Sequence, residues 1–65
     1  MEVQLHILTH GRIYTEEYDS IEEALQAALE LRGEPRERAV EISVGGETRL
    51  AGDALEQAID ACADA

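Results

Sequence analysis

Residues 20–35 read SIEEALQAALELRGEP and contain the strongest local signal in the chain. Ser20 followed by Glu23 is a capping box, with Ser20 as the N-cap and Glu23 as the third helical residue. Gly33 is typical of a helix end, so the pattern predicts a helix that runs to Arg32. The apolar residues of this helix fall on one broad arc: Ile21, Ala24, Leu25, Ala28, Leu29 and Leu31.

An alternation of apolar and other residues over 2–8, before this helix, predicts a half-buried strand. His10-Gly11 supplies a tight turn, because glycine readily takes the positive φ that such a turn needs. The return strand is expected over residues 12–18. A two-residue loop would set Ile7 opposite Tyr14.

The same register carries both Tyr14 and Tyr18 to the core face, since opposed residues of an antiparallel pair share a face. It also leaves Leu8 opposite Ile13 on the outer face, where no element is expected to cover them.

After the helix, Val40, Ile42 and Val44 alternate with polar residues and predict a third strand over 40–44. Gly45-Gly46 turns the chain, and residues 47–50 return as a fourth strand. We favour a three-residue loop, which sets Val44 opposite Thr48 and Ile42 opposite Leu50. A two-residue loop would bring Arg49 to the core face.

Asp53 and Glu56 stand in the N-cap and third positions of a second helix, which forms another capping box. Leu55, Ile59 and Cys62 define its buried stripe. The expected fold class is therefore α+β in the order ββαββα. It is a four-stranded antiparallel sheet with both helices on one face, in a single domain over residues 1–65.

The charge balance excludes several classes of partner. The chain has 65 residues with 15 acidic and five basic ones, and its formal net charge is −10. Direct binding to nucleic acid or to an anionic membrane is therefore not expected, because both require basic residues. No apolar run spans a membrane, and Glu2 follows Met1 with no basic region of a signal peptide. A cytoplasmic protein is expected.

Candidate residues for chemistry are few, and neither a cofactor nor a metal is expected. His6 and His10 are four apart, but on a strand and its turn this spacing does not place them side by side. Cys62 lies on an apolar stripe, where a free cysteine is typically a small packing residue. A chain this short has little core with which to desolvate and activate a carboxylate, so no catalytic residue is assigned.

The acidic surface is the remaining feature. Asp53, Glu56, Asp60 and Asp64 form one stripe on the second helix, where carboxylates recur every ~5 Å along the axis. Glu22, Gln26 and Glu30 belong to the polar face of the first helix. These seven residues are the candidate partner-binding surface, and the expected partner is a basic protein surface. Solubility is the alternative role of such charge.

Small size, acidity, the lack of enzymatic motifs and the ββαββα order together resemble the small phage-encoded anti-CRISPR proteins. Several members of that group are acidic DNA mimics that occupy the groove where a CRISPR effector reads DNA. The resemblance implies a non-enzymatic inhibitor whose carboxylates replace phosphates. The arginines at positions 32, 36 and 38 break the negative field at one end. That end is expected either to lie outside the mimic surface or to bind an acidic patch of the partner.

A second interpretation is a small regulatory or antitoxin-like interaction module. Such a module would bind its partner through an apolar sheet face, at Leu8 and Ile13, or through an exposed strand edge. Salt dependence separates the two, because electrostatic mimicry weakens steeply with salt and apolar docking does not.

Overall fold

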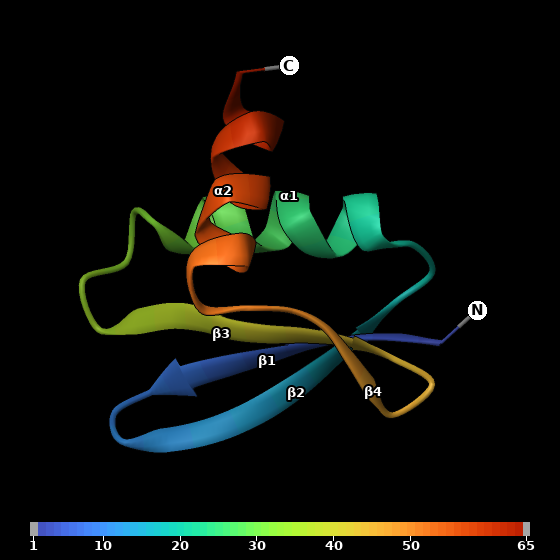
Figure 1. Cartoon of the computed structure of the whole chain (residues 1–65). Helices are drawn as coiled ribbons and strands as arrows, with labels where there is room; N and C mark the ends of the chain where they lie inside the picture. Colours follow the sequence, from blue (N-terminus) through green and yellow to red (C-terminus); the bar gives the residue numbers. More distant parts are fainter. Residues whose placement is uncertain (1, 65) are drawn as a thin grey trace.

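The computed structural model describes residues 2–64 and has the expected order ββαββα (Figure 1). The elements are β1 Val3–Thr9, β2 Arg12–Tyr18, α1 Ile21–Leu31, β3 Glu37–Val44, β4 Glu47–Ala51 and α2 Gly52–Ala63. The α+β class predicted from the sequence is confirmed.

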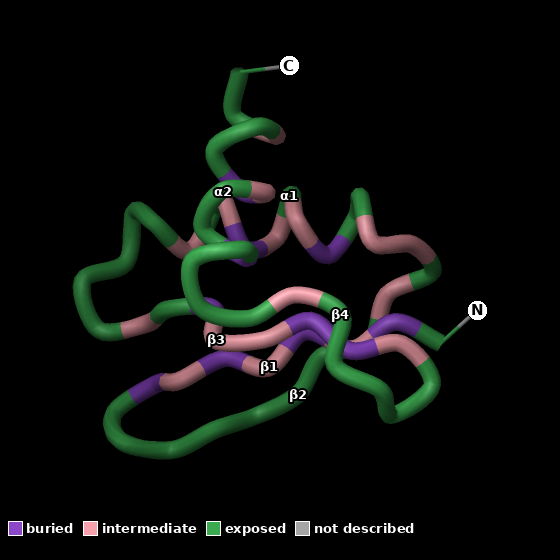
Figure 2. Tube along the Cα trace, viewed as in Figure 1, coloured by how far each residue is buried: buried purple, intermediate pink, exposed green. Residues whose placement is uncertain are grey.

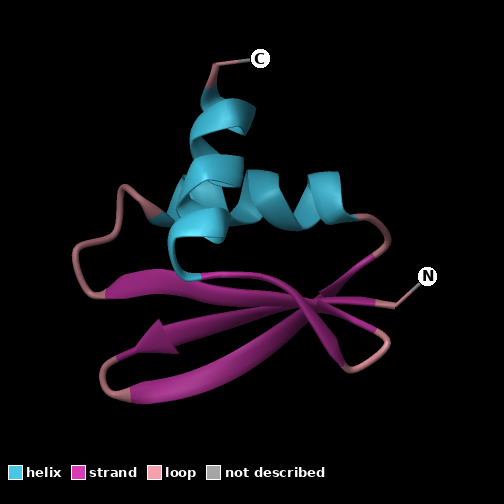
Figure 3. Cartoon of the chain, in the orientation of Figure 1, coloured by secondary structure: helices cyan, strands magenta, loops and turns pink. Residues whose placement is uncertain are grey.

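The four strands form one antiparallel sheet in the order β2-β1-β3-β4, with β2 and β4 at its edges. Both helices lie on the same face of this sheet (Figure 3). α1 runs across the sheet, whereas α2 begins directly after β4 and rises away from it, so that its last turns extend beyond α1. The opposite face of the sheet is not covered by a helix.

The hairpin of β1 and β2 has the predicted two-residue loop and register, with Ile7 opposite Tyr14 and Leu8 opposite Ile13. His10 and Gly11 have φ values of 51° and 79°, which are typical of a tight hairpin turn. Tyr14 lies on the helix face as expected but remains 48% exposed. It is exposed because β2 is an edge strand that extends past the helix cover.

A β-bulge in β3 changes the predicted core. His6 is opposite Glu41 but Ile7 is opposite Ala39, so Val40 is the extra residue. Ala39 is buried, whereas Val40 is only partly buried. The simple alternation expected across residues 40–44 therefore fails at its first residue.

The predicted loop between β3 and β4 is wrong, although one of its predicted pairs is confirmed. Gly45 and Gly46 alone form the loop, with φ values of 59° and 82°, and Val44 faces Glu47 instead of Thr48. A second bulge at Arg49 then restores the predicted pairing of Ile42 with Leu50. The bulge also leaves Arg49 exposed. The three-residue loop is favoured from the sequence for the same reason, because it keeps Arg49 away from the core face.

The predicted cap of α1 is confirmed. The Ser20 hydroxyl accepts a hydrogen bond from the Glu23 backbone N–H at 3.1 Å. The Glu23 carboxylate reaches one residue further back than expected and accepts from the Asp19 N–H at 3.3 Å. The helix ends at Leu31 with Arg32 as its C-cap, one residue from the predicted end.

The predicted cap of α2 is wrong. Ala51 is the N-cap and makes no side-chain cap hydrogen bond, while Asp53 lies inside the first turn. Glu56 consequently does not stand in a capping-box position. The strand runs directly into the helix through Gly52, whose φ is 57°, so the helix starts before Asp53. A carboxylate in the first turn still interacts favourably with the helix dipole.

The core lies between the helices and the two central strands (Figure 2). Its buried members are apolar residues from the helices and from β1 and β3: Val3, Leu5, Ile7, Ala24, Ala28, Ala39, Ile42, Leu55 and Ile59. Cys62, predicted to belong to the α2 stripe with Leu55 and Ile59, is only partly buried. It lies on the part of α2 that extends beyond the sheet.

Candidate functional site

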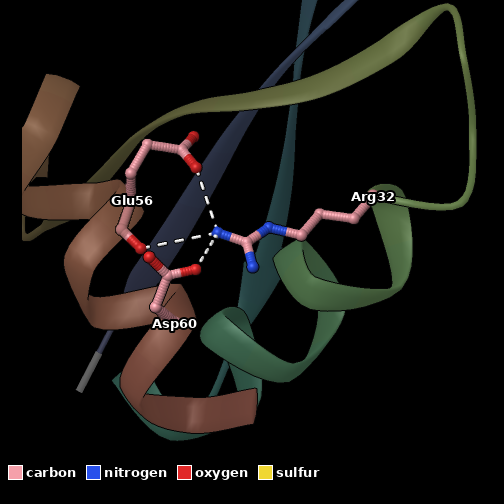
Figure 4. A network of polar contacts seen from close by, with 3 residues as sticks. All are labelled: Arg32, Glu56 and Asp60. Atoms are coloured by element: carbon pink, nitrogen blue, oxygen red, sulfur yellow. Dashed lines mark hydrogen bonds and ion pairs between the residues drawn. The ribbon is translucent and has the colours of Figure 1, made fainter.

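The stripe predicted on α2 consists of Asp53, Glu56, Asp60 and Asp64, and all four residues are exposed. Its two central members are held by a cation of the same chain. Arg32 Nη2 donates to Asp60 Oδ1 at 2.7 Å and to Glu56 Oε2 at 3.1 Å (Figure 4). The Glu56 carbonyl oxygen lies 3.5 Å from the same nitrogen.

These bonds change the electrostatics of the stripe. The hydrogen bonds to Asp60 and Glu56, in that order, raise the pKa of Arg32 above its ordinary value. Arg32 thus neutralises part of the charge that the α2 stripe presents to solvent. Because Arg32 is the C-cap of α1, 24 residues before Glu56, the sequence pattern of α2 alone does not reveal it.

The three residues predicted on α1, Glu22, Gln26 and Glu30, are also exposed. Their spacing of four residues places them along one side of the helix. Glu22 and Gln26 border an open groove between α1 and α2, whose apolar floor includes Leu25 and Ala58. Glu30, further along the helix, borders a hollow between α1 and β2.

Sequence reasoning missed a cluster of exposed acidic residues at one end of the sheet, which we call the acidic end. The N-terminus, the β2–α1 loop and the β3–β4 hairpin meet at one end of the sheet (Figure 1). The Gly45 N–H donates to the Glu2 carbonyl at 3.0 Å, and Glu2, Glu17 and Asp19 line one open hollow. The members of the acidic end are Glu2, Glu17, Asp19, Glu22, Glu23 and Glu47. They come from three stretches of the chain, which are the N-terminus, residues 17–23 and the β3–β4 hairpin, and only the fold joins them.

The opposite end of the sheet carries basic residues. Arg12 and Glu37 both pair with Thr9 in the register, and Arg38 faces Leu8, so these residues gather around the far end of β1. Both ion pairs found within residues 2–64 belong to Arg32. Neither therefore involves the acidic end.

A second acidic hollow lies between α1 and the helix face of β2, and we call it the α1–β2 hollow. Its apolar floor includes Ile7, Tyr18 and Leu31. Four carboxylates border it: Glu16, Glu30, Glu34 and Glu37. Tyr18 Oη donates to Glu16 Oε2 at 2.7 Å. Burial, then this hydrogen bond, then the charges of Glu16 and Glu30 raise the pKa of Tyr18 to about 12.

We expect the raised pKa of Tyr18 to appear in an absorbance titration of the two tyrosines. The folded-state value lies above the ordinary 10.0. The stability due to neutral Tyr18 is therefore complete below pH 10.0 and is lost as the pH rises through about 12. Glu16→Gln should lower this pKa, because it removes the charged acceptor. Survival of the late transition in Tyr18→Phe would assign it to Tyr14 and contradict the prediction.

The open face of the sheet holds a polar network around His6. Thr15 Oγ1 lies 3.0 Å from His6 Nδ1, and His6 Nε2 lies 2.9 Å from Ser43 Oγ. Ser43 Oγ donates to Gln4 Oε1 at 3.5 Å. The Ser43 hydroxyl is therefore held between Gln4 and His6, and Ser43 is only 3% exposed.

Metal binding finds no support within residues 2–64, where no group of three or more suitable side chains is placed to hold an ion. In the same residues no helix has the length and hydropathy to cross a membrane. His10, the other histidine singled out by its spacing, is the first residue of the β1–β2 turn and is exposed.

No protein-family model, curated protein or solved structure matches the chain. We therefore infer function from the position of the charges and exposed side chains of the chain.

Proposed function

We propose that this chain is a non-enzymatic inhibitor that binds a basic nucleic-acid-binding surface in place of DNA. The proposed target is a CRISPR-Cas surveillance complex in the cytoplasm of a bacterial host. The observation that carries this proposal is the acidic end, where exposed carboxylates from three stretches of the chain lie at one end of the sheet and where neither ion pair of the described residues reaches.

Electrostatics supports this assignment. Lys and Arg residues that bind DNA are arranged to neutralise closely spaced phosphates. Carboxylates held by a sheet end and a helix N-terminus offer fixed negative charges to the same residues without the cost of ordering a flexible segment. Two members of the α2 stripe, Asp53 and Asp64, take part in neither of the ion pairs found within residues 2–64, whereas Glu56 and Asp60 are engaged by Arg32.

The test is competition on a purified effector complex with its target DNA. We expect the protein and the DNA to displace one another, because both would occupy the same basic groove. Binding should also weaken steeply between ~50 and ~200 mM salt. Binding that DNA does not displace would overturn the mimic proposal, whatever effect the protein has on the activity of the complex.

The second candidate is an interaction module that binds a protein through its sheet. It is favoured by one observation: the two large exposed apolar side chains, Ile13 at 58% and Tyr14 at 48%, both lie on the edge strand β2. Association through this strand would change little over the salt range in which mimicry fails.

A further inference from the structure

The strand β2 is an edge with little of the usual protection against pairing. It is seven residues long, lies outermost in the sheet and is exposed along nearly its whole length. Its pairing with β1 is regular, without a bulge, and it contains no proline or lysine. Natural edge strands use such devices, or charged side chains, to prevent pairing with another chain, and the charged residues of β2 are Arg12, Glu16 and Glu17.

The register identifies which backbone groups of β2 are free. Because the loop has two residues, Thr9 and Arg12 flank it as a hydrogen-bonded pair, and alternate residues along β2 bond to β1. The main chains of Ile13, Thr15 and Glu17 consequently direct their N–H and C=O groups away from the sheet. These groups are available to a further strand.

We propose that two copies of this chain associate through β2, antiparallel and centred on Tyr14. In this register Tyr14 faces Tyr14 of the second copy, and Ile13 faces Thr15 of the second copy and exchanges main-chain hydrogen bonds with it. The two sheets would join into one, with all helices on the same side. The proposal does not depend on the inhibitor function proposed above.

Charge complementarity selects this register. It sets Arg12 opposite Glu16 of the second copy, twice by symmetry, at non-hydrogen-bonded positions where side chains approach most closely. Arg12 takes part in neither of the ion pairs found within residues 2–64. Glu16 borders the α1–β2 hollow with three other carboxylates, so the incoming guanidinium would enter a site of opposite charge.

The neighbouring register, centred on Thr15, lacks this complementarity. It sets Arg12 opposite Tyr18 and Ile13 opposite Glu17, so no opposite charges meet and an apolar side chain faces a carboxylate. Of the two registers, only the one centred on Tyr14 therefore sets Arg12 opposite Glu16 and the two Tyr14 rings opposite each other.

The interface is small and each copy carries a net charge of −10, so we expect a reversible dimer that forms at high protein concentration. Sedimentation equilibrium over a wide concentration range measures it. Amide hydrogen exchange should show protection of Ile13 and Thr15 that increases with protein concentration. A protein that remains monomeric up to ~1 mM would overturn the proposal.

A charge swap tests the register. Arg12→Glu and Glu16→Arg should each weaken association by about tenfold or more, because like charges then face one another. The double variant should restore association to within about threefold of the wild type. Arg49→Glu, on the bulge of the opposite edge strand, is the matched control for the change in net charge.

The control should leave association within about threefold of its original value. An equal effect of Arg12→Glu and Arg49→Glu, or a double variant that stays monomeric while its circular dichroism is native, would contradict the proposed interface.

Discussion

Charge reversal at Glu17 and Glu47 is expected to weaken binding to the basic partner by roughly 10- to 100-fold at moderate salt. Both residues are exposed at the acidic end, on β2 and on the β3–β4 hairpin, and neither caps a helix. Replacement by lysine turns two attractions into two repulsions and should leave the fold intact. Titration calorimetry against the effector complex, with a melting curve of each variant, provides the measurement.

The matched control reverses Asp53 and Asp64 on α2, which changes the net charge equally. Asp53 and Asp64 are the two ends of the α2 stripe. Asp60 is avoided because a lysine there would repel Arg32, and a loss of stability could then be mistaken for a loss of binding. A smaller loss from this pair is expected. Equal losses would assign the effect to the overall field, and a larger loss would place the binding surface on α2.

Two structural features determined by neighbouring residues, the cap of α1 and the register of β1 with β2, were predicted correctly. The Ser20 cap and the extent of α1 follow from a capping signal next to an apolar arc. The register of β1 with β2 follows from the length of the His10-Gly11 loop. In both cases the decisive interactions join residues that are close in sequence, so a local pattern contains them.

The features that were not predicted are two bulges in strand pairing and the start of α2. The bulge at Val40 arises where β3 pairs with β1. The bulge at Arg49 arises where β4 pairs with β3. Arg49 shows how a bulge can replace an added loop residue, because both devices keep a charged side chain out of the core. The start of α2 was missed because β4 runs into the helix without an intervening loop.

Part of the candidate site was likewise predicted from the sequence, and part was not. The α2 stripe was found because its members recur along one helix. The engagement of Glu56 and Asp60 by Arg32 was not, because it depends on how α1 and α2 cross. The acidic end joins three stretches of the chain, and no periodicity within any one of them identifies it.

Ile42→Ala is expected to cost about 2–5 kcal/mol of the free energy of unfolding. Ile42 is 0% exposed, and it lies in β3 between Leu5 on one neighbouring strand and Leu50 on the other. Truncation leaves a cavity that two flanking strands and the helix layer above them cannot fill. Because a small domain has a stability of only about 5 kcal/mol, this variant should be largely unfolded in mild denaturant.

Leu25→Ala is the matched truncation on α1, and we expect it to cost only about 1–2 kcal/mol, because Leu25 is partly exposed and alanine favours the helix. Urea unfolding followed by circular dichroism compares the two variants. The order of the two midpoints is the decisive result, since both changes delete the same number of carbon atoms and differ only in what surrounds them. A variant at Ile42 as stable as one at Leu25 would mean that β3 does not form the centre of the core, and it would contradict the pairing of Ile42 with Leu5 and Leu50.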